Sequence, residues 1–252
     1  MRVIDLGTMP YRDAWAAQER AHDEVVGGGE EQLLLVEHPP VITFGRRPNV
    51  RRNVIASDES LNQLGVEVVQ SDRGGDVTFH GPGQVVAYPI VRLNDHRLSV
   101  GAFVRRLEET VIATLREFGI DARKSPDAIG VWVPQPDGRL AKICALGVRI
   151  RRGVSMHGIA LNVTTDLRYF DLIVPCGLVD RPVTSVQKAL RDRAPSFGDV
   201  KNTLARRFVS AFTPSPGTPG EGGGEGSVAT TSSAPMRKNP HLIPLPEYRE
   251  RG

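Results

Sequence analysis

Apolar and polar residues follow one another over residues 1–212 in patterns typical of short strands mixed with amphipathic helices. Runs rich in apolar and β-branched residues predict buried strands at 33–36, 41–44, 66–69, 85–90, 128–133, 139–148 and 154–163. Apolar residues spaced three or four apart predict helices at 10–27, 57–64, 99–119 and 196–212, and residues 166–183 show no regular pattern. We therefore expect one globular domain over residues 1–212.

The composition changes abruptly after Phe212. The chain becomes rich in Gly, Pro, Ser and Thr, and residues 213–240 contain no segment that can bury apolar surface. Residues 213–252 are therefore expected to form a disordered linker and C-terminal tail.

Overall composition narrows the class of protein. Of the 252 residues, 40% are hydrophobic, which suits a globular protein with a sizeable core. No window approaches the roughly 18 apolar residues of a membrane span, and the N-terminus lacks a signal-peptide pattern, so we expect a cytoplasmic protein that does not enter a membrane. The two cysteines, Cys144 and Cys176, are too few for a disulfide framework. The net charge of +3 is a mild excess that favours ordinary surface charge over nucleic-acid binding.

A glycine-rich stretch from Arg73 to Gln84 is expected to form the wall of a binding site. Its glycines allow a ligand to lie against the main chain, and its polar side chains can orient that ligand. The stretch lies between two predicted strands, so it does not fit a dinucleotide-binding loop, which needs a following helix. The alternative is a glycine-rich turn at a sheet edge whose polar side chains face water.

Two further segments carry groups suited to chemistry. Lys142 lies in a predicted strand among apolar residues, where lysine is rare unless it has a partner or a task, although its ammonium could also reach solvent at the strand end. Cys176 lies in a loop between Pro175 and Gly177, which is a better place for a reactive thiol than the apolar strand around Cys144. A lysine ammonium near a thiol stabilises the thiolate, so the segments together suggest nucleophilic thiol chemistry. Cys144 lies two residues from Lys142 on a strand and could share its face, which leaves open which thiol reacts.

These motifs resemble those of the lipoyl(octanoyl) transferase family. The first motif is Arg73-Gly74-Gly75 followed by Thr78, Phe79, His80, Gln84 and Tyr88. The second joins 142–147 to 157–162, and the third is Pro175-Cys176-Gly177. The motifs occur in the family's order, and the resemblance covers about residues 1–212.

The resemblance implies a single α+β domain with a mixed sheet, similar to the catalytic domain of biotin and lipoate protein ligases. It implies that Cys176 accepts an octanoyl group from octanoyl-acyl carrier protein as a thioester, with Lys142 activating the thiol. The acceptor is then a lysine of an apo lipoyl domain, in 2-oxoacid dehydrogenase subunits or the glycine cleavage H protein. No metal or other cofactor is implied, and a monomer is expected. The substrate-binding residues implied are Arg73, Gly74, Gly75, Asp76, Val77, Thr78, Phe79, His80, Ala145, Leu146, Gly147, Gly158, Ile159 and Ala160.

Two alternatives remain from the sequence. An ATP-dependent lipoate or biotin ligase would form an acyl adenylate and need no nucleophilic thiol, so the Cys176 loop argues against it. A non-catalytic acyl-binding or nucleic-acid-binding protein would make the pairing of Lys142 and Cys176 an accident.

Overall fold

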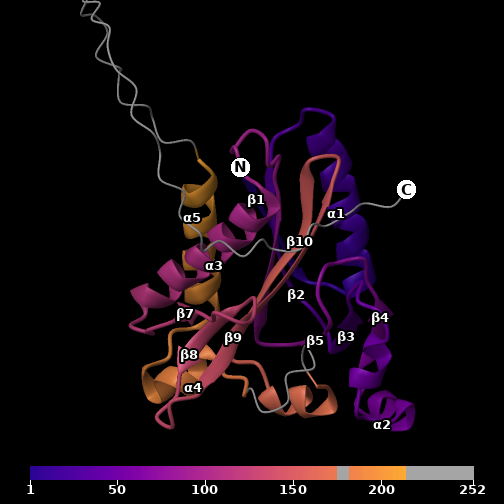
Figure 1. Cartoon of the computed structure of the whole chain (residues 1–252), viewed down its shortest axis with the longest axis vertical. Coiled ribbons are helices and arrows are strands. Elements are labelled where there is room, and N and C mark those ends of the chain that lie inside the picture. The colour runs from indigo at the N-terminus through magenta and orange to yellow at the C-terminus, as the bar shows by residue number, and fades with distance from the viewer. Residues whose placement is uncertain (175–181, 214–252) are drawn as a thin grey trace, which may run out of the picture. The chain divides into compact units, whose positions relative to one another are not determined.

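The computed structural model describes residues 1–174 and 182–213, and its central element is a mixed seven-stranded sheet (Figure 1). Neighbouring β1 and β2 are parallel, and each later pair of neighbours is antiparallel. In spatial order the strands are β1 (Arg2–Thr8), β2 (Gln32–Glu37), β6 (Gln84–Ile90), β10 (Val154–Asn162), β9 (Leu140–Arg151), β8 (Val131–Pro134) and β7 (Arg123–Lys124). The mixed α+β architecture expected from the resemblance is confirmed.

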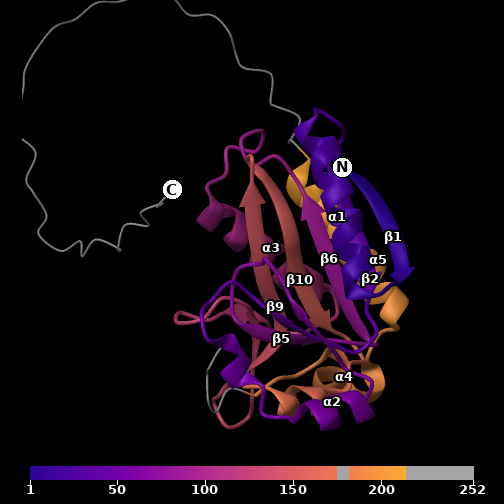
Figure 2. The same cartoon turned by 90° about the vertical axis from the view of Figure 1, so that its right-hand side faces the viewer.

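Helices cover both faces of this sheet. Helix α1 (Tyr11–Val26) packs on one face, and α3 (Val100–Glu117) and α5 (Phe197–Phe212) pack on the other (Figures 1 and 2). Successive strand residues point to opposite faces. In β2, Leu33 accordingly packs in the core with α3 and α5, and Leu34 packs in the core with α1. The central strands are therefore apolar on both faces, which explains their continuous apolar runs.

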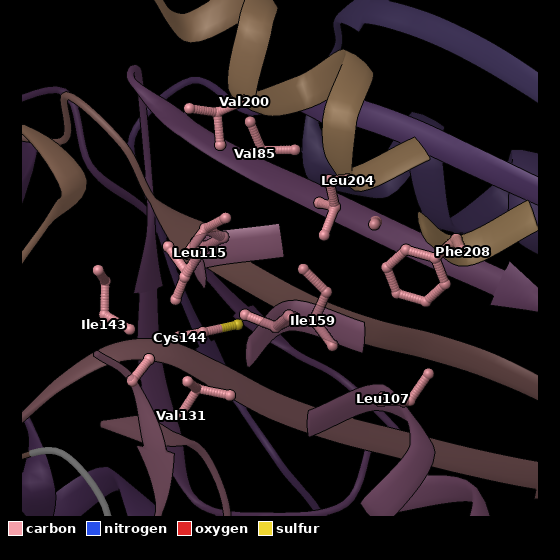
Figure 3. Packing of buried hydrophobic residues seen from close by; sticks show 14 of the residues in the cluster. Val85, Leu107, Leu115, Val131, Ile143, Cys144, Ile159, Val200, Leu204 and Phe208 are labelled. Atoms are coloured by element: carbon pink, nitrogen blue, oxygen red, sulfur yellow. The ribbon is translucent and has the colours of Figure 1, made fainter. Parts of the chain in front are cut away.

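The larger apolar core lies between the sheet and the pair α3 and α5. Figure 3 shows Leu107 and Leu115 of α3 and Phe208 of α5 packed against strand residues, and Cys144 lies among them. The Ser196 hydroxyl accepts from the Asp199 N–H and the Asp199 carboxylate accepts from the Ser196 N–H, a capping box that begins α5 at the expected residue.

A smaller three-stranded sheet lies beside the large one. Its order is β4 (Glu67–Gln70), β3 (Val41–Phe44) and β5 (Val77–His80). Its apolar residues pack against α2 (Asp58–Gln63) and the 3₁₀ turns η1 (Val50–Asn53) and η2 (Leu167–Leu172). The remaining helical elements are α4 (Val186–Leu190) and η4 (Arg191–Arg193).

Three strands were not predicted from the sequence: β1, β5 and the two-residue β7. The strand expected at 128–133 runs instead from Val131 to Pro134, so residues 128–130 lie in the loop before it. Strand β1 lies at the sheet edge with mostly exposed side chains, so it lacks the apolar run that marks a buried strand. Strand β5 lies inside the glycine-rich stretch from Arg73 to Gln84, where no strand was predicted. Val77 and Phe79 are each 1% exposed and pack in the small sheet's core. The alternation of side chains along this segment is therefore sufficient to form a strand despite the glycines on either side of it.

In the described part of the chain, no helix is both long enough and apolar enough to pass through a bilayer. The disorder expected for the tail concerns residues after Thr213, which lie outside the described residues.

Replacing Leu107 by Ala tests the main core. The Leu107 side chain is fully buried in α3, so its truncation is expected to lower the free energy of unfolding by about 3 kcal/mol, from lost burial and the cavity left behind. Urea denaturation measures this loss. Arg105→Ala, on the exposed face of the same helix, is the matched control and should change stability by less than about 0.5 kcal/mol. Equal losses in the two variants would contradict the packing described.

Candidate active site

A cavity of about 520 Å³ lies at the meeting point of the two sheets. Its wall includes the loop before β5, parts of β6, β9 and β10, Tyr11 of α1 and the first turns of α3. Its volume falls in the range of small-molecule sites, roughly 300–1,000 Å³.

The structure brings almost all of the sequence-predicted site residues to this cavity. The lining residues among them are Arg73, Gly74, Gly75, Asp76, Val77, Thr78, His80, Lys142, Ala145, Leu146, Gly147, Gly158, Ile159 and Ala160. Phe79 is not among the lining residues, because its ring faces the small sheet's core and stacks on Tyr169 at 4.7 Å between centroids. Cys176 lies outside the described residues.

The glycines of the site allow main chains to approach one another closely. A Cβ on Gly147 would lie 2.8 Å from the Gly74 carbonyl oxygen, and a Cβ on Gly158 would lie 2.2 Å from the Ala87 carbonyl oxygen. Gly74 itself donates its N–H to the Val148 carbonyl at 2.9 Å. These glycines therefore hold the stretch 73–76 against the large sheet while forming part of the cavity wall.

Arg73 is buried, with its guanidinium directed toward the small sheet. Its Nη2 donates to the Thr43 carbonyl at 2.7 Å, and both Nε and Nη2 donate to Thr43 Oγ1 at 3.2 and 3.0 Å. Asp76 Oδ1 accepts from Asn53 Nδ2 at 2.8 Å and from the Val77 N–H at 2.7 Å. The charged residues at the start of the stretch thus fix its conformation as well as lining the cavity.

His80 is the middle of a directed chain of hydrogen bonds. Gln84 Nε2 donates to Asn162 Oδ1 at 2.9 Å and to the Phe79 carbonyl, so Gln84 Oε1 accepts from His80 Nδ1 at 2.8 Å. His80 Nε2 then accepts from Thr43 Oγ1 at 3.4 Å, the long link of the chain. Burial lowers the pKa of His80 well below its usual value, so the ring is neutral as this chain requires.

His38 and Tyr88 extend the polar floor below the cavity. Burial lowers the pKa of His38 to about 4, so its Nδ1–H donates to the Met9 carbonyl at 2.7 Å and its Nε2 accepts from the Tyr88 hydroxyl at 2.8 Å. The Tyr11 ring stacks on His80 at 5.9 Å between centroids. The floor is therefore aromatic and uncharged at neutral pH.

His157 lies at the edge of this floor in an unusual backbone conformation. Its φ is +57°, and its N–H donates to Gln18 Oε1 at 2.7 Å. Burial, with the nearby charges of Arg73 and Arg149, lowers the pKa of His157 to about 3. The neutral ring donates Nε2–H to Asp72 Oδ1 at 2.6 Å, and Asp72 also pairs with Arg149. We conclude that His157 is held as a fixed neutral side chain.

A β-bulge separates Lys142 from Cys144. Val131 pairs with Cys144 and the next residue, Trp132, pairs with Lys142, so Ile143 is an extra residue on β9. The bulge breaks the two-residue alternation: Lys142 lines the cavity, whereas Ile143 and Cys144 both lie in the apolar core (Figure 3). Cys144 is fully buried, and burial strongly raises the pKa of its thiol. The expectation that Lys142 and Cys144 could share a face is therefore wrong.

The described residues that border 175–181 lie close to the cavity. On one side, the Val174 N–H donates to the carbonyl of Asn53, whose side chain binds Asp76. On the other side, the Lys142 N–H donates to the Pro182 carbonyl at 2.8 Å, the Thr184 N–H donates to the Lys142 carbonyl at 2.9 Å, and Val183 lines the cavity. Both flanks are thus held by residues that touch or line the site.

Sequence reasoning missed several lining residues. Tyr11 comes from the first helix, Val100 and Val104 from α3, and Asp127, Ala128 and Ile129 from a loop before β8. None belongs to a recognisable motif. Val100 and Ile129 are half or more exposed, and this exposure of apolar side chains at a cavity is visible only in three dimensions.

Several known proteins are similar in sequence to most of this chain. The family model "Lipoyl protein ligase A/B catalytic domain" matches residues 10–209. The octanoyltransferase of Nitratidesulfovibrio vulgaris (strain DP4) is 44% identical over 213 residues, covering 84% of this chain and 95% of the relative. The octanoyltransferase of Koribacter versatilis (strain Ellin345) is 46% identical over 216 residues, covering 84% of each chain.

A solved structure supports the fold. A lipoate-protein ligase A bound with ATP superimposes with a TM-score of 0.68 at 20% identity, covering 83% of this chain and 84% of that chain. The expected likeness of the fold to lipoate ligases is therefore confirmed.

The Cys144 thiol is expected to be inert in the folded protein. Because the side chain is fully buried and the thiolate is disfavoured there, iodoacetamide at pH 8 should not modify Cys144 until the protein is unfolded with guanidinium. Peptide mapping by mass spectrometry measures the modification. Alkylation of Cys144 in the native protein at a rate similar to that of a free thiol would show that it does not lie in the core.

Stability is expected to decrease in acid because of His38. Its pKa of about 4 in the folded protein lies below the ordinary 6.5, so between these values the unfolded chain binds a proton that the folded chain does not. Protonation of His38 in the unfolded chain should lower the free energy of unfolding by about 1.4 kcal/mol for each pH unit below pH 6.5. Above pH 6.5 it should have no effect. Chemical denaturation at pH 7, 6 and 5 measures the slope. The His38→Gln variant, which cannot titrate, should show a shallower slope, and equal slopes would exclude this role.

Proposed function

We propose a two-step octanoyl transfer through Cys176. The chain belongs to the lipoyl protein ligase A/B catalytic-domain family and, within it, to the octanoyltransferases, which are acyltransferases. The donor is octanoyl-acyl carrier protein, and the acceptor is a lysine of an apo lipoyl domain. The observation that carries the proposal is that motifs far apart in the sequence line one cavity, with Lys142 in its wall.

The position of Lys142 supports the first step. Its ammonium stabilises the Cys176 thiolate, which attacks the thioester carbonyl carbon of the donor. A new sulfur–carbon bond forms, the donor's sulfur–carbon bond breaks, and the carrier leaves as a thiol with a proton from Lys142. Cys176 follows Val174 by two residues in the sequence, the Val174 N–H donates to the Asn53 carbonyl, and Val183 lines the cavity, which supports the proposed role of this thiol.

The same lysine serves the second step. The neutral Lys142 amine takes a proton from the acceptor lysine as that nitrogen attacks the octanoyl thioester. The amide bond forms, the thioester bond breaks, and Cys176 leaves as a thiolate beside the restored ammonium. The protons balance over the two steps, and because the donor thioester is already activated, the transfer consumes no ATP.

The character of the cavity supports an acyl substrate. Apolar side chains such as Val86 and Leu146 lie in the same wall as the glycines, and the histidine floor is uncharged. Burial of apolar surface contributes roughly 0.8 kcal/mol per CH₂ group, enough to retain an eight-carbon chain. Arg47 lines the cavity, and Arg46, Arg51 and Arg52 are exposed nearby in sequence, which suits an acidic carrier protein.

An ATP-dependent ligase is the second candidate, favoured by the fold of the lipoate-protein ligase A described above. Such an enzyme would activate a free acid as its adenylate. It would not form a stable bond between the acyl group and Cys176.

The two candidates are distinguished by mixing the protein with octanoyl-acyl carrier protein in the absence of ATP. We expect an octanoyl adduct on Cys176, seen by intact mass and peptide mapping, which disappears when an apo lipoyl domain is added and gains the octanoyl group. Cys176→Ala should abolish both the adduct and the transfer. Cys144→Ala is the matched control and should retain both, since Cys144 lies in the core.

Each opposing result has a defined meaning. An adduct on Cys144 would keep the activity and move the nucleophile. Transfer that appears only with free octanoate and ATP would make the protein a ligase.

A further inference from the structure

The Lys142 ammonium lies over the face of a buried indole ring. Lys142 Nζ is 4.7 Å from the centroid of the Trp132 ring, within the distance at which a cation is attracted by an aromatic face. Trp132 is 1% exposed and Lys142 is 9% exposed, so water screens this contact only weakly. The contact therefore joins Lys142, which lines the cavity, to Trp132, which does not.

Trp132 is held rigidly in this position. Its backbone pairs with Lys142 across the bulge, and its Nε1 donates to the Ala128 carbonyl at 3.3 Å. The pairing of Trp132 with Lys142 continues the regular register of Val133 with Ala141 and Pro134 with Leu140, and the bulge begins only at Ile143.

Gly130 leaves room for both side chains. A Cβ at this position would lie 3.2 Å from Lys142 Cε and 3.3 Å from Trp132 Nε1, and the φ of +138° is one that other residues rarely adopt. The Gly130 N–H donates to the buried Glu108 carboxylate at 3.0 Å, which fixes this turn. The loop before β8 is thus shaped around the contact between lysine and tryptophan.

We propose that Trp132 is a positioning residue for Lys142, whose ammonium it holds at the cavity wall through a cation–π contact. The inference rests on the proposed function, in which this ammonium stabilises the thiolate of Cys176. Because the ring attracts the cation and not the neutral amine, it favours the charged form needed before the first step. It acts through Lys142 and does not touch the substrate.

Other charged groups share this environment. Among the residues that the structure describes, those that line the same cavity are Arg47, Arg73, Asp76 and Asp127, with the neutral His80 and His157, and Glu108 lies behind Gly130. A substitution of Trp132 removes none of these groups. Labelling of Lys142 with and without the ring is therefore compared at constant charge.

The experiment is trace labelling of lysines with isotopic acetic anhydride across a pH series, with Lys142 followed by peptide mass spectrometry. In Trp132→Leu the pH midpoint of Lys142 labelling should fall by about 0.5 to 1.5 pH units relative to wild type. Trp132→Phe keeps an aromatic face and should shift the midpoint by less than half as much. In parallel, the acid limb of octanoyl-Cys176 formation should move to higher pH in Trp132→Leu.

Phe208→Leu is the matched control for lost packing. Phe208 is a fully buried aromatic residue of α5 in the main core (Figure 3), so its replacement weakens the fold without touching Lys142. Its labelling midpoint should equal that of wild type, and thermal denaturation of all variants verifies folding.

An unchanged or raised midpoint in Trp132→Leu would overturn the inference, as would a lowered midpoint without any shift of the acylation profile. Absence of an octanoyl adduct in the wild type would instead overturn the proposed function. The labelling midpoint is read without substrate, so the two failures are distinguishable.

Discussion

The site depends on one chain of directed hydrogen bonds that joins the two sheets. The chain begins at a buried guanidinium in the loop before β5 and ends at a backbone carbonyl beside Lys142. His80, at the centre of the chain, can donate from Nδ1 and accept at Nε2 only while its imidazole is neutral. Burial keeps it neutral. Its members in order are Arg73, Thr43, His80, Gln84, Asn162 and Thr184. Loss of a member would leave a buried polar group unpaired and loosen the small sheet from the large one.

The same burial that keeps the histidines neutral shapes the chemistry of the cavity. His38 and His157 contribute hydrogen bonds without charge, so these histidines add no charge near the cavity that Lys142 lines. Electrostatic interactions are stronger where water is excluded. A cation there stabilises an adjacent thiolate more than it would at the surface. In the mechanism we propose, the apolar wall and the lysine are complementary parts of one acyl-transfer site.

The fold alone does not separate a transferase from a ligase. The lipoate-protein ligase A structure has a similar fold at 20% identity, so the scaffold is compatible with either chemistry. In the mechanism we propose, the distinction rests on local features: the Cys176 thiol, and Lys142 in the cavity wall, which the bulge at Ile143 separates from Cys144.

The sequence by itself determined the main helices and central strands, because their periodicity comes from residues close together in the chain. It also singled out residues that line one cavity, since the glycine-rich stretch, Lys142 and residues 158–160 carry a recognisable pattern. The tertiary structure alone decided that Phe79 turns away from the cavity, that the bulge separates Lys142 from Cys144, and that Trp132 lies under the ammonium. These features depend on contacts between segments distant in sequence, where packing and burial override local alternation.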